Sequence, residues 1–115
     1  MKTIVITPGD PAGIGPEVTA KALLKLESKL KKSSILIFGS RNPFHRYPKI
    51  LRAKNISFIE PPIHPKPGFQ AGWSIEQATQ LVLSSPKDHV LITGPIHKQR
   101  LNDGGYRFQG HTDFL

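Results

Sequence analysis

Three short segments of this sequence combine glycine, proline and titratable side chains in patterns that could support chemistry. The first, residues 7–17, contains three glycines together with Asp10. Glycine lets a backbone approach a ligand closely, and a helix that starts just after such a loop favours a phosphate or carboxylate at its N-terminus. The spacing matches neither the dinucleotide-binding G-x-G-x-x-G pattern nor the P-loop pattern. On residue type alone, a ligand site and a structural tight turn are both open for this loop.

The second segment, residues 93–98, follows an apolar run with a Gly-Pro turn and then brings His97 and Lys98. A lysine can neutralise the charge of a phosphate, and a histidine can carry a proton near neutral pH. The competing interpretation is an ordinary turn between a strand and a helix, with polar side chains exposed to solvent.

The third segment, residues 108–115, places His111 directly before Thr112. Thr112 has the side chain of a helix N-cap, and Asp113 would then lie in the first helical turn. We expect His111 to be able to hydrogen-bond an anion held at that helix start, although a lone histidine is more often structural.

The other histidines share no metal-ligand spacing, and no Ser-His-Asp or Cys-His grouping is visible. The chain contains no cysteine, which excludes disulfides and thiolate metal ligands. Its apolar runs are too short to span a bilayer, and no signal-peptide pattern opens the sequence. We therefore expect a cytoplasmic protein that does not act at a membrane.

The elements that must position these segments alternate between strand and helix. This order predicts an α/β fold, a mostly parallel sheet with helices on both faces. Ligands in such sheets bind beyond the carboxyl ends of the strands, where the first two segments fall. Strands are expected at 3–7, 34–39, 57–59 and 90–93, and helices at 16–30, 42–53 (with Pro48 as a possible break) and 73–84.

The length of 115 residues suits one small domain, and no linker divides residues 1–115. The net charge is +8, and eleven of the sixteen Lys and Arg residues lie between Lys21 and Lys66. Four lysines three or four residues apart would line one solvated helix face. Because aromatic residues are not interleaved with these cations, a specific nucleic-acid site is not expected.

Taken together, the three segments resemble the signatures of the 4-hydroxythreonine-4-phosphate dehydrogenase family of pyridoxal phosphate biosynthesis. The similarity lies in residues 6–17, in residues 91–98, and in Asn102–Gly105 followed by Phe108–Phe114. The three occur in the family's order and at plausible spacing, although residues 30–72 match only loosely. The first signature is also similar to the Gly-Asp-Gly-Ile-Gly-Pro-Glu loop of isocitrate and isopropylmalate dehydrogenases.

This resemblance implies an isocitrate/isopropylmalate dehydrogenase-like fold, here in an incomplete, N-terminal form, and a homo-oligomer. The implied reaction is NAD- or NADP-dependent oxidation of a phosphorylated small molecule, 4-phosphohydroxy-L-threonine, followed by decarboxylation. The implied cofactors are NAD or NADP and a divalent metal ion. We expect a truncated form of the enzyme, inactive by itself and prone to self-association through exposed strand edges.

Residue by residue, the resemblance assigns substrate binding to His111 and Thr112. Asp10, His97 and Lys98 lie inside the signatures and are expected to line the cleft, without an assigned role. The family's metal-binding histidines lie beyond residue 115, so no metal ligand is assigned here. Three alternatives stay open: a paralogue acting on another phosphorylated hydroxy acid or a cyclic diol, a non-catalytic anion-binding remnant, and a basic nucleic-acid-binding protein.

Overall fold

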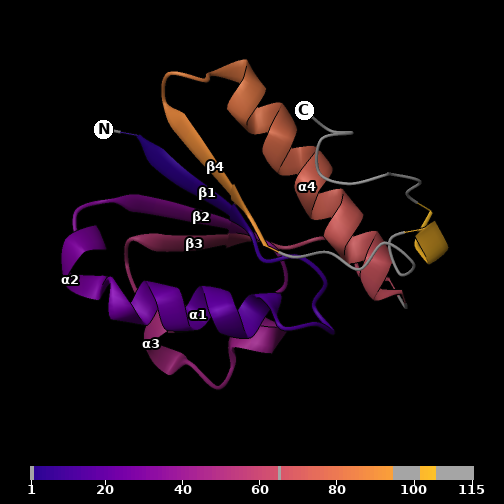
Figure 1. Ribbon diagram of the computed structural model, residues 1–115, viewed down its shortest axis with the longest axis horizontal. Helices are drawn as coiled ribbons and strands as arrows, with labels where there is room; N and C mark the ends of the chain where they lie inside the picture. The colour runs from indigo at the N-terminus through magenta and orange to yellow at the C-terminus, as the bar shows by residue number, and fades with distance from the viewer. Residues whose placement is uncertain (1, 65, 95–101, 106–115) are drawn as a thin grey trace.

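The computed structural model describes residues 2–64, 66–94 and 102–105. Its centre is a sheet of four parallel strands in the order β3-β2-β1-β4 (Figure 1). In register, Ile6 of the first strand lies between Ile37 and Ile92 of its two neighbours. The predicted parallel α/β sheet is therefore confirmed. The strands are β1 (Thr3–Thr7), β2 (Ser34–Phe38), β3 (Ile56–Ile59) and β4 (His89–Thr93).

Helices cover both faces of the sheet, as the continuous apolar strands predicted. Figure 1 shows α1 and α3 on one side of the sheet and α4 on the other. The helical elements are α1 (Gly15–Lys25), α2 (Glu27–Leu30), a 3-10 turn (Asn42–Phe44), α3 (Pro48–Arg52) and α4 (Pro67–Ser84).

Two helix boundaries differ from the sequence prediction, and the possible break at Pro48 is confirmed. The helix expected from 16 to 30 is interrupted at Leu26, whose ψ of 12° is not helical, so α2 is a separate turn. The segment 42–53 divides at Pro48, which takes the first position of α3 because its missing N–H is no loss there. Helix α4 begins at Pro67, six residues before the predicted start at Trp73, for the same reason.

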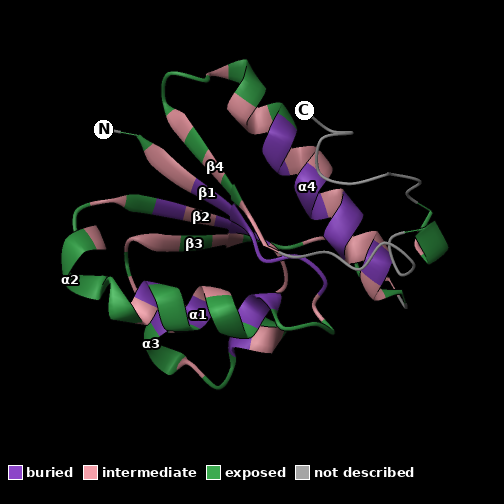
Figure 2. Cartoon of the chain, in the orientation of Figure 1, coloured by how far each residue is buried: buried purple, intermediate pink, exposed green. Residues whose placement is uncertain are grey.

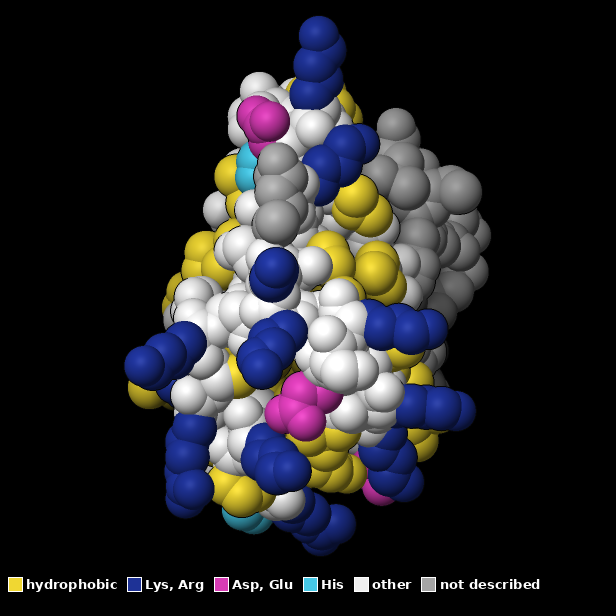
Figure 3. All heavy atoms as spheres, turned by 90° about the vertical axis from the view of Figure 1, so that its left-hand side faces the viewer, with side chains coloured by type: hydrophobic (Ala, Val, Ile, Leu, Met, Phe, Trp, Pro, Cys, Tyr) yellow, Lys and Arg dark blue, Asp and Glu magenta, His cyan; other side chains and the backbone are white. Residues whose placement is uncertain are grey.

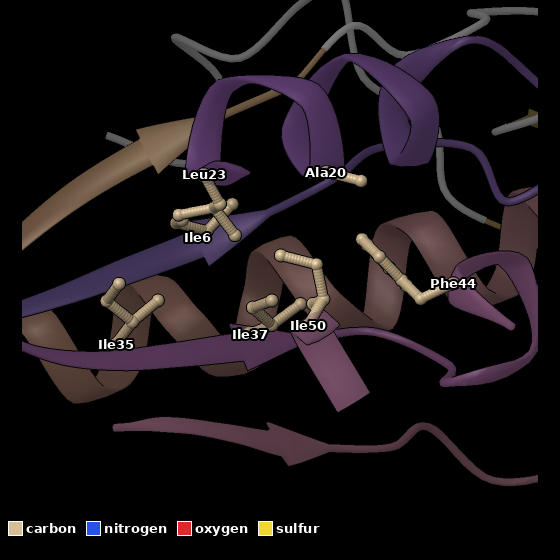
Figure 4. Packing of buried hydrophobic residues seen from close by; sticks show 7 residues of the cluster. All are labelled: Ile6, Ala20, Leu23, Ile35, Ile37, Phe44 and Ile50. Carbon is tan, nitrogen blue, oxygen red and sulfur yellow. The ribbon is translucent and has the colours of Figure 1, made fainter. Parts of the chain in front are cut away.

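The larger core lies between α1, α3 and the sheet. Figure 4 shows Leu23 of α1 close to Ile6 of β1, and Phe44 from the 3-10 turn beside Ile50. Phe44 also meets Phe58 of β3 edge to face, with the ring centroids 5.3 Å apart. The buried members of this core are Ile6, Ala20, Leu23, Ile35, Ile37, Phe44 and Ile50.

A smaller core on the opposite face fixes α4 against the sheet. Val5, Phe38 and Ala78 are buried there, and the Trp73 ring lies 6.5 Å from that of Phe38. Since α4 connects two parallel strands, it runs antiparallel to them, and its first turn lies at the carboxyl edge of the sheet. No helix among the described residues has the length and apolarity needed to cross a bilayer.

Candidate functional site

The loop after β1 is held in shape by Asp10. The Asp10 carboxylate accepts a hydrogen bond from the Ala12 N–H at 2.8 Å, and the Asp10 carbonyl accepts one from the Gly13 N–H at 2.9 Å. Gly9, the residue before Asp10, has a φ of 92°, a backbone conformation that residues other than glycine rarely adopt. Asp10 is only 3% exposed. The structure therefore gives Asp10 a definite role, that of fixing this turn at the end of β1.

The end of β4 lies directly against the start of this loop. The Gly94 N–H donates a hydrogen bond to the Thr7 carbonyl at 2.6 Å. A Cβ placed on Gly94 would lie 2.4 Å from the carbonyl oxygen of Pro8 and 2.7 Å from its carbon. Real Cβ atoms do not approach that closely, so Gly94 allows the first and second signature segments to meet at the carboxyl edge.

The segment 102–105 packs against the first turn of α4, which lies at the same edge of the sheet (Figure 1). A Cβ on Gly104 would lie 2.2 Å from the Phe69 nitrogen and 2.5 Å from the Gly68 carbon. The Lys66 ammonium donates a hydrogen bond to the Asp103 carbonyl at 2.9 Å. Close contacts at two glycines thus bring parts of all three signature segments to one end of the molecule.

Of the predicted site residues, only Asp10 belongs to the described part of the chain. His97, Lys98, His111 and Thr112 lie outside the described residues. The described frame places Gly94 three residues before His97, at the carboxyl edge. The cleft-lining and substrate-binding assignments of these four residues therefore stay predictions.

A small pocket at this edge has a lining that sequence reasoning missed. It is formed by Gly9 after β1, Gly39 after β2, and the side chains of Gln70 and Ser74 from α4. Gln70 was missed because the helix was expected to begin at Trp73, whereas Ser74 lay inside the expected helix and carried no signal of its own. Ser74 is buried and lines this pocket, and the available signal for Gln70 was Pro67, which is suited to a first helical turn.

Two further properties bear on the chemistry of the described part. Thr7, the last residue of β1, has a buried hydroxyl for which the described atoms offer no hydrogen-bond partner.

Within residues 2–64, 66–94 and 102–105, no group of three or more His, Asp and Glu side chains could hold a metal ion. The described residues therefore do not by themselves fit a metal site.

Most of the positive charge lies outside the three signature segments. Residues 25–54 contain nine Lys and Arg residues and one acidic residue, a net charge of +8 that equals the charge of the whole chain. Figure 3 looks onto the amino-terminal edge of the sheet, where Lys and Arg side chains project around a few acidic side chains. The net charge of the chain thus comes from a segment outside the signature loops.

Comparison with known proteins gives consistent matches, although no protein-family model matches the chain. A 4-hydroxythreonine-4-phosphate dehydrogenase of Sulfurihydrogenibium is 30% identical over 138 residues, covering 100% of this chain and 42% of that protein. A D-threonate 4-phosphate dehydrogenase of Pectobacterium atrosepticum is 29% identical over 143 residues, covering 99% of this chain and 43% of that protein. The chain spans less than half the length of these curated relatives.

Solved structures agree with the sequence comparison. The crystal structure of a 4-hydroxythreonine-4-phosphate dehydrogenase from Burkholderia phymatum superposes with a TM-score of 0.79 at 26% identity, covering 100% of this chain and 42% of that one. That of the Klebsiella pneumoniae enzyme gives a TM-score of 0.73 at 27% identity, covering 99% of this chain and 43% of that one. The four-stranded fold described above is thus similar to part of these enzymes.

Proposed function

We infer a function from the fact that the chain is homologous, along its whole length, to the N-terminal portion of the 4-hydroxythreonine-4-phosphate dehydrogenase family. The proposal is that it forms the front part of an oxidoreductase. That enzyme oxidises 4-phosphohydroxy-L-threonine with NAD or NADP, with decarboxylation, in pyridoxal phosphate biosynthesis. The observation that carries the proposal is the meeting of the signature segments at one edge of the sheet, through the close contacts of Gly94 and Gly104.

The proposed roles of individual residues follow from their place in this frame. Asp10 holds the first loop in one conformation, so that its backbone can line the cleft without rearrangement. His111 and Thr112 are proposed to bind the substrate, and His97 and Lys98 to line the cleft near the end of β4. The described residues offer no metal site, so the divalent metal ion is proposed to be bound by the remaining portion of a complete enzyme.

A second substrate has specific support. The D-threonate 4-phosphate dehydrogenase relative is 29% identical, against 30% for the 4-hydroxythreonine-4-phosphate dehydrogenase relative. Both names describe oxidation of a phosphorylated hydroxy acid. The alternative function is therefore that of a paralogue acting on D-threonate 4-phosphate or a similar compound, with the same fold and the same cofactor class.

The same proposal implies a cellular location, an oligomeric state and a set of partners. A phosphorylated metabolite and a nicotinamide cofactor are intracellular compounds, so we propose a cytoplasmic location. The complete enzyme is proposed to be a homo-oligomer without a specific nucleic-acid partner. Binding to duplex DNA that falls steeply with added salt would contradict that last point.

The experiment that tests the function uses a chimera in which these 115 residues replace the corresponding part of the Sulfurihydrogenibium enzyme. NADH formation is followed with each of the two phosphorylated substrates, with NAD and a divalent metal present. The preferred function predicts the higher kcat/KM with 4-phosphohydroxy-L-threonine, and the paralogue predicts it with D-threonate 4-phosphate. A folded chimera that uses neither substrate would contradict both.

The isolated chain is the companion sample. Because the metal site is proposed to come from the remaining portion, we expect no NADH formation from the 115 residues alone beside an active full-length relative. Binding of the phosphorylated substrate to the isolated chain without turnover would favour an anion-binding remnant. Turnover by the isolated chain would show that residues of this chain suffice, and the proposed division of labour would be wrong.

A further inference from the structure

A groove lies on the face of the sheet that α1 covers, between the end of α1, α2 and α3. Its first hollow has a volume of about 440 Å³, within the range of about 300–1,000 Å³ that ligand pockets usually have. Buried Leu23, Ile35 and Ile50 form its floor, and half-buried Leu30 and Ile56 lie beside them. Since Ile35 and Ile56 belong to the starts of β2 and β3, the groove lies at the end of the sheet opposite to the signature loops.

A second hollow continues this groove toward residues 46–48. Its volume is about 390 Å³, and Tyr47 and Pro48 line it. Leu24, Glu27 and Lys49 line both hollows, so the two are neighbours and form one groove. In Figure 2, α2 beside the groove carries no buried residue. Two adjoining hollows suit an extended ligand with two apolar groups better than one compact metabolite.

The rim of the groove is positively charged. Lys31 lines the first hollow, Arg46 lines the second and Lys49 lines both, and all three residues are exposed. Glu27 is the only acidic residue in either lining. The ion pairs among the described residues, Lys21 with Glu17 and Arg41 with Glu60, involve none of the three rim cations. Within the described part of the chain, these cations therefore have no acidic partner and are available to an anionic ligand.

The surface around the groove has the same sign of charge. Residues 25–54, which supply most of the lining, contain nine Lys and Arg residues and one acidic residue. Figure 3 shows hydrophobic side chains exposed among Lys and Arg side chains at this end of the molecule. An apolar floor with a positive rim is complementary to a segment that carries apolar side chains on one side and carboxylates beside them.

We propose that this groove binds an acidic, amphipathic peptide segment of another protein. Two apolar anchor side chains of that segment fill the two hollows, and its carboxylates lie beside Lys31 at one end and Arg46 at the other. Glu27 lies where the hollows adjoin and disfavours a carboxylate at the middle of the segment. The expected ligand is therefore acidic toward both ends and neutral or basic at its centre. The proposal goes beyond the proposed function and does not depend on it.

Other occupants fit the groove less well. A second copy of this chain carries the same net charge of +8 and is repelled. A nucleic acid would meet the cations, but Tyr47 is the only aromatic residue in either lining, so no series of rings is present on which bases could stack. A bilayer surface takes up apolar side chains that project from a protein, whereas the apolar residues of the first hollow form a floor.

The test selects ligands for the 115-residue chain from a display library of random peptides and measures the affinity of the most enriched peptide by fluorescence anisotropy. We expect enrichment of peptides with Asp or Glu toward both ends and two large apolar residues between them. K49E reverses a rim charge and S28W fills the first hollow, and each is expected to weaken binding at least tenfold. The matched controls are K87E and S84W, because Lys87 and Ser84 are exposed and line neither hollow.

Circular dichroism melts establish that each variant is folded, and K31E provides a second charge reversal at the rim. A selection without acidic peptides, equal affinity of K49E and K87E, or equal affinity of S28W and S84W would each overturn the proposal. Duplex DNA or anionic phospholipid vesicles that bind the unmodified chain and K87E but not K49E would assign the groove to those partners and also overturn it.

The chimera with the Sulfurihydrogenibium enzyme separates this proposal from the proposed function. We expect the selected peptide to bind the chimera as tightly as it binds the isolated chain. Loss of peptide binding in the chimera would show that the remaining part of the enzyme covers the groove, and the proposal of a separate partner would be wrong. A chimera that binds the peptide but forms no NADH would count against the proposed function alone.

Discussion

Replacement of Gly94 by alanine tests the close contact between the end of β4 and the first loop. The added Cβ would lie 2.4 Å from the Pro8 carbonyl oxygen. Because the atoms that it would meet belong to the backbone, a rotation of a side chain cannot relieve the clash. To restore an ordinary contact distance, the end of β4 has to move away from the first loop by close to an ångström. That movement also strains the 2.6 Å hydrogen bond from the Gly94 N–H to the Thr7 carbonyl.

Three effects decide the magnitude. Overpacking against a fixed neighbour costs about 1–3 kcal/mol. Weakening the hydrogen bond adds up to about 1 kcal/mol. In the other direction, alanine restricts the unfolded chain and stabilises by about 0.4–1 kcal/mol, since Gly94 has no positive φ that alanine would resist. We therefore expect a net loss of about 1–3 kcal/mol, a large share of the roughly 5–15 kcal/mol of a small domain.

Urea denaturation of the isolated chain, followed by circular dichroism, measures this loss as a lower midpoint. The matched control is Gly13→Ala, because a Cβ at Gly13 would lie 3.4 Å from the Asp10 carbonyl oxygen, an ordinary contact. If Gly94→Ala and Gly13→Ala unfold at the same urea concentration as the unmodified chain, the close approach of β4 to the first loop is wrong.

Three more outcomes are expected from the isolated chain. Asp10→Ala removes the acceptor for the Ala12 N–H and should lower the free energy of unfolding by about 1.5–3 kcal/mol, with Asp10→Asn in between; an unchanged urea midpoint would show that the turn forms without the carboxylate. Thr7→Val removes a buried hydroxyl that has no partner among the described residues and should raise the melting temperature by about 4 °C; a lower melting temperature would mean that the hydroxyl is paired. Gly104→Ala should release the 102–105 segment from α4, seen as faster amide exchange at Phe69 and Gly105 with the exchange of β1 unchanged; protection equal to that of the unmodified chain would contradict the contact.

The sheet was predictable because its strands are short apolar runs that alternate with amphipathic helices. Ile4–Ile6 and Ile35–Phe38 form the two inner strands of the sheet, an order that the sequence analysis did not predict. The helix boundaries were less predictable. The break at Leu26 has no local breaker residue, and the start of α4 at Pro67 was hidden in a proline-rich connector that reads as irregular.

The sequence identified the loops that form the candidate site, but it did not predict the contacts between them. Glycine in a turn can mean a positive φ or a close approach, and sequence alone does not say which neighbour comes close. The contact of Gly94 with Pro8 and that of Gly104 with Phe69 therefore emerged only from the three-dimensional arrangement. The same holds for Asp10, which was expected to line a cleft and which the structure shows bonded within its own turn.

The central claim is that these 115 residues supply the N-terminal portion of a dehydrogenase for a phosphorylated hydroxy acid. The most direct test is the rate of NADH formation by the chimera with the Sulfurihydrogenibium enzyme, compared with that of its parent under saturating substrate, NAD and metal. The account predicts substrate-dependent NADH formation that is lost in the His111→Ala chimera. A folded chimera of the parent's oligomeric state that forms no NADH with either phosphorylated substrate would contradict it.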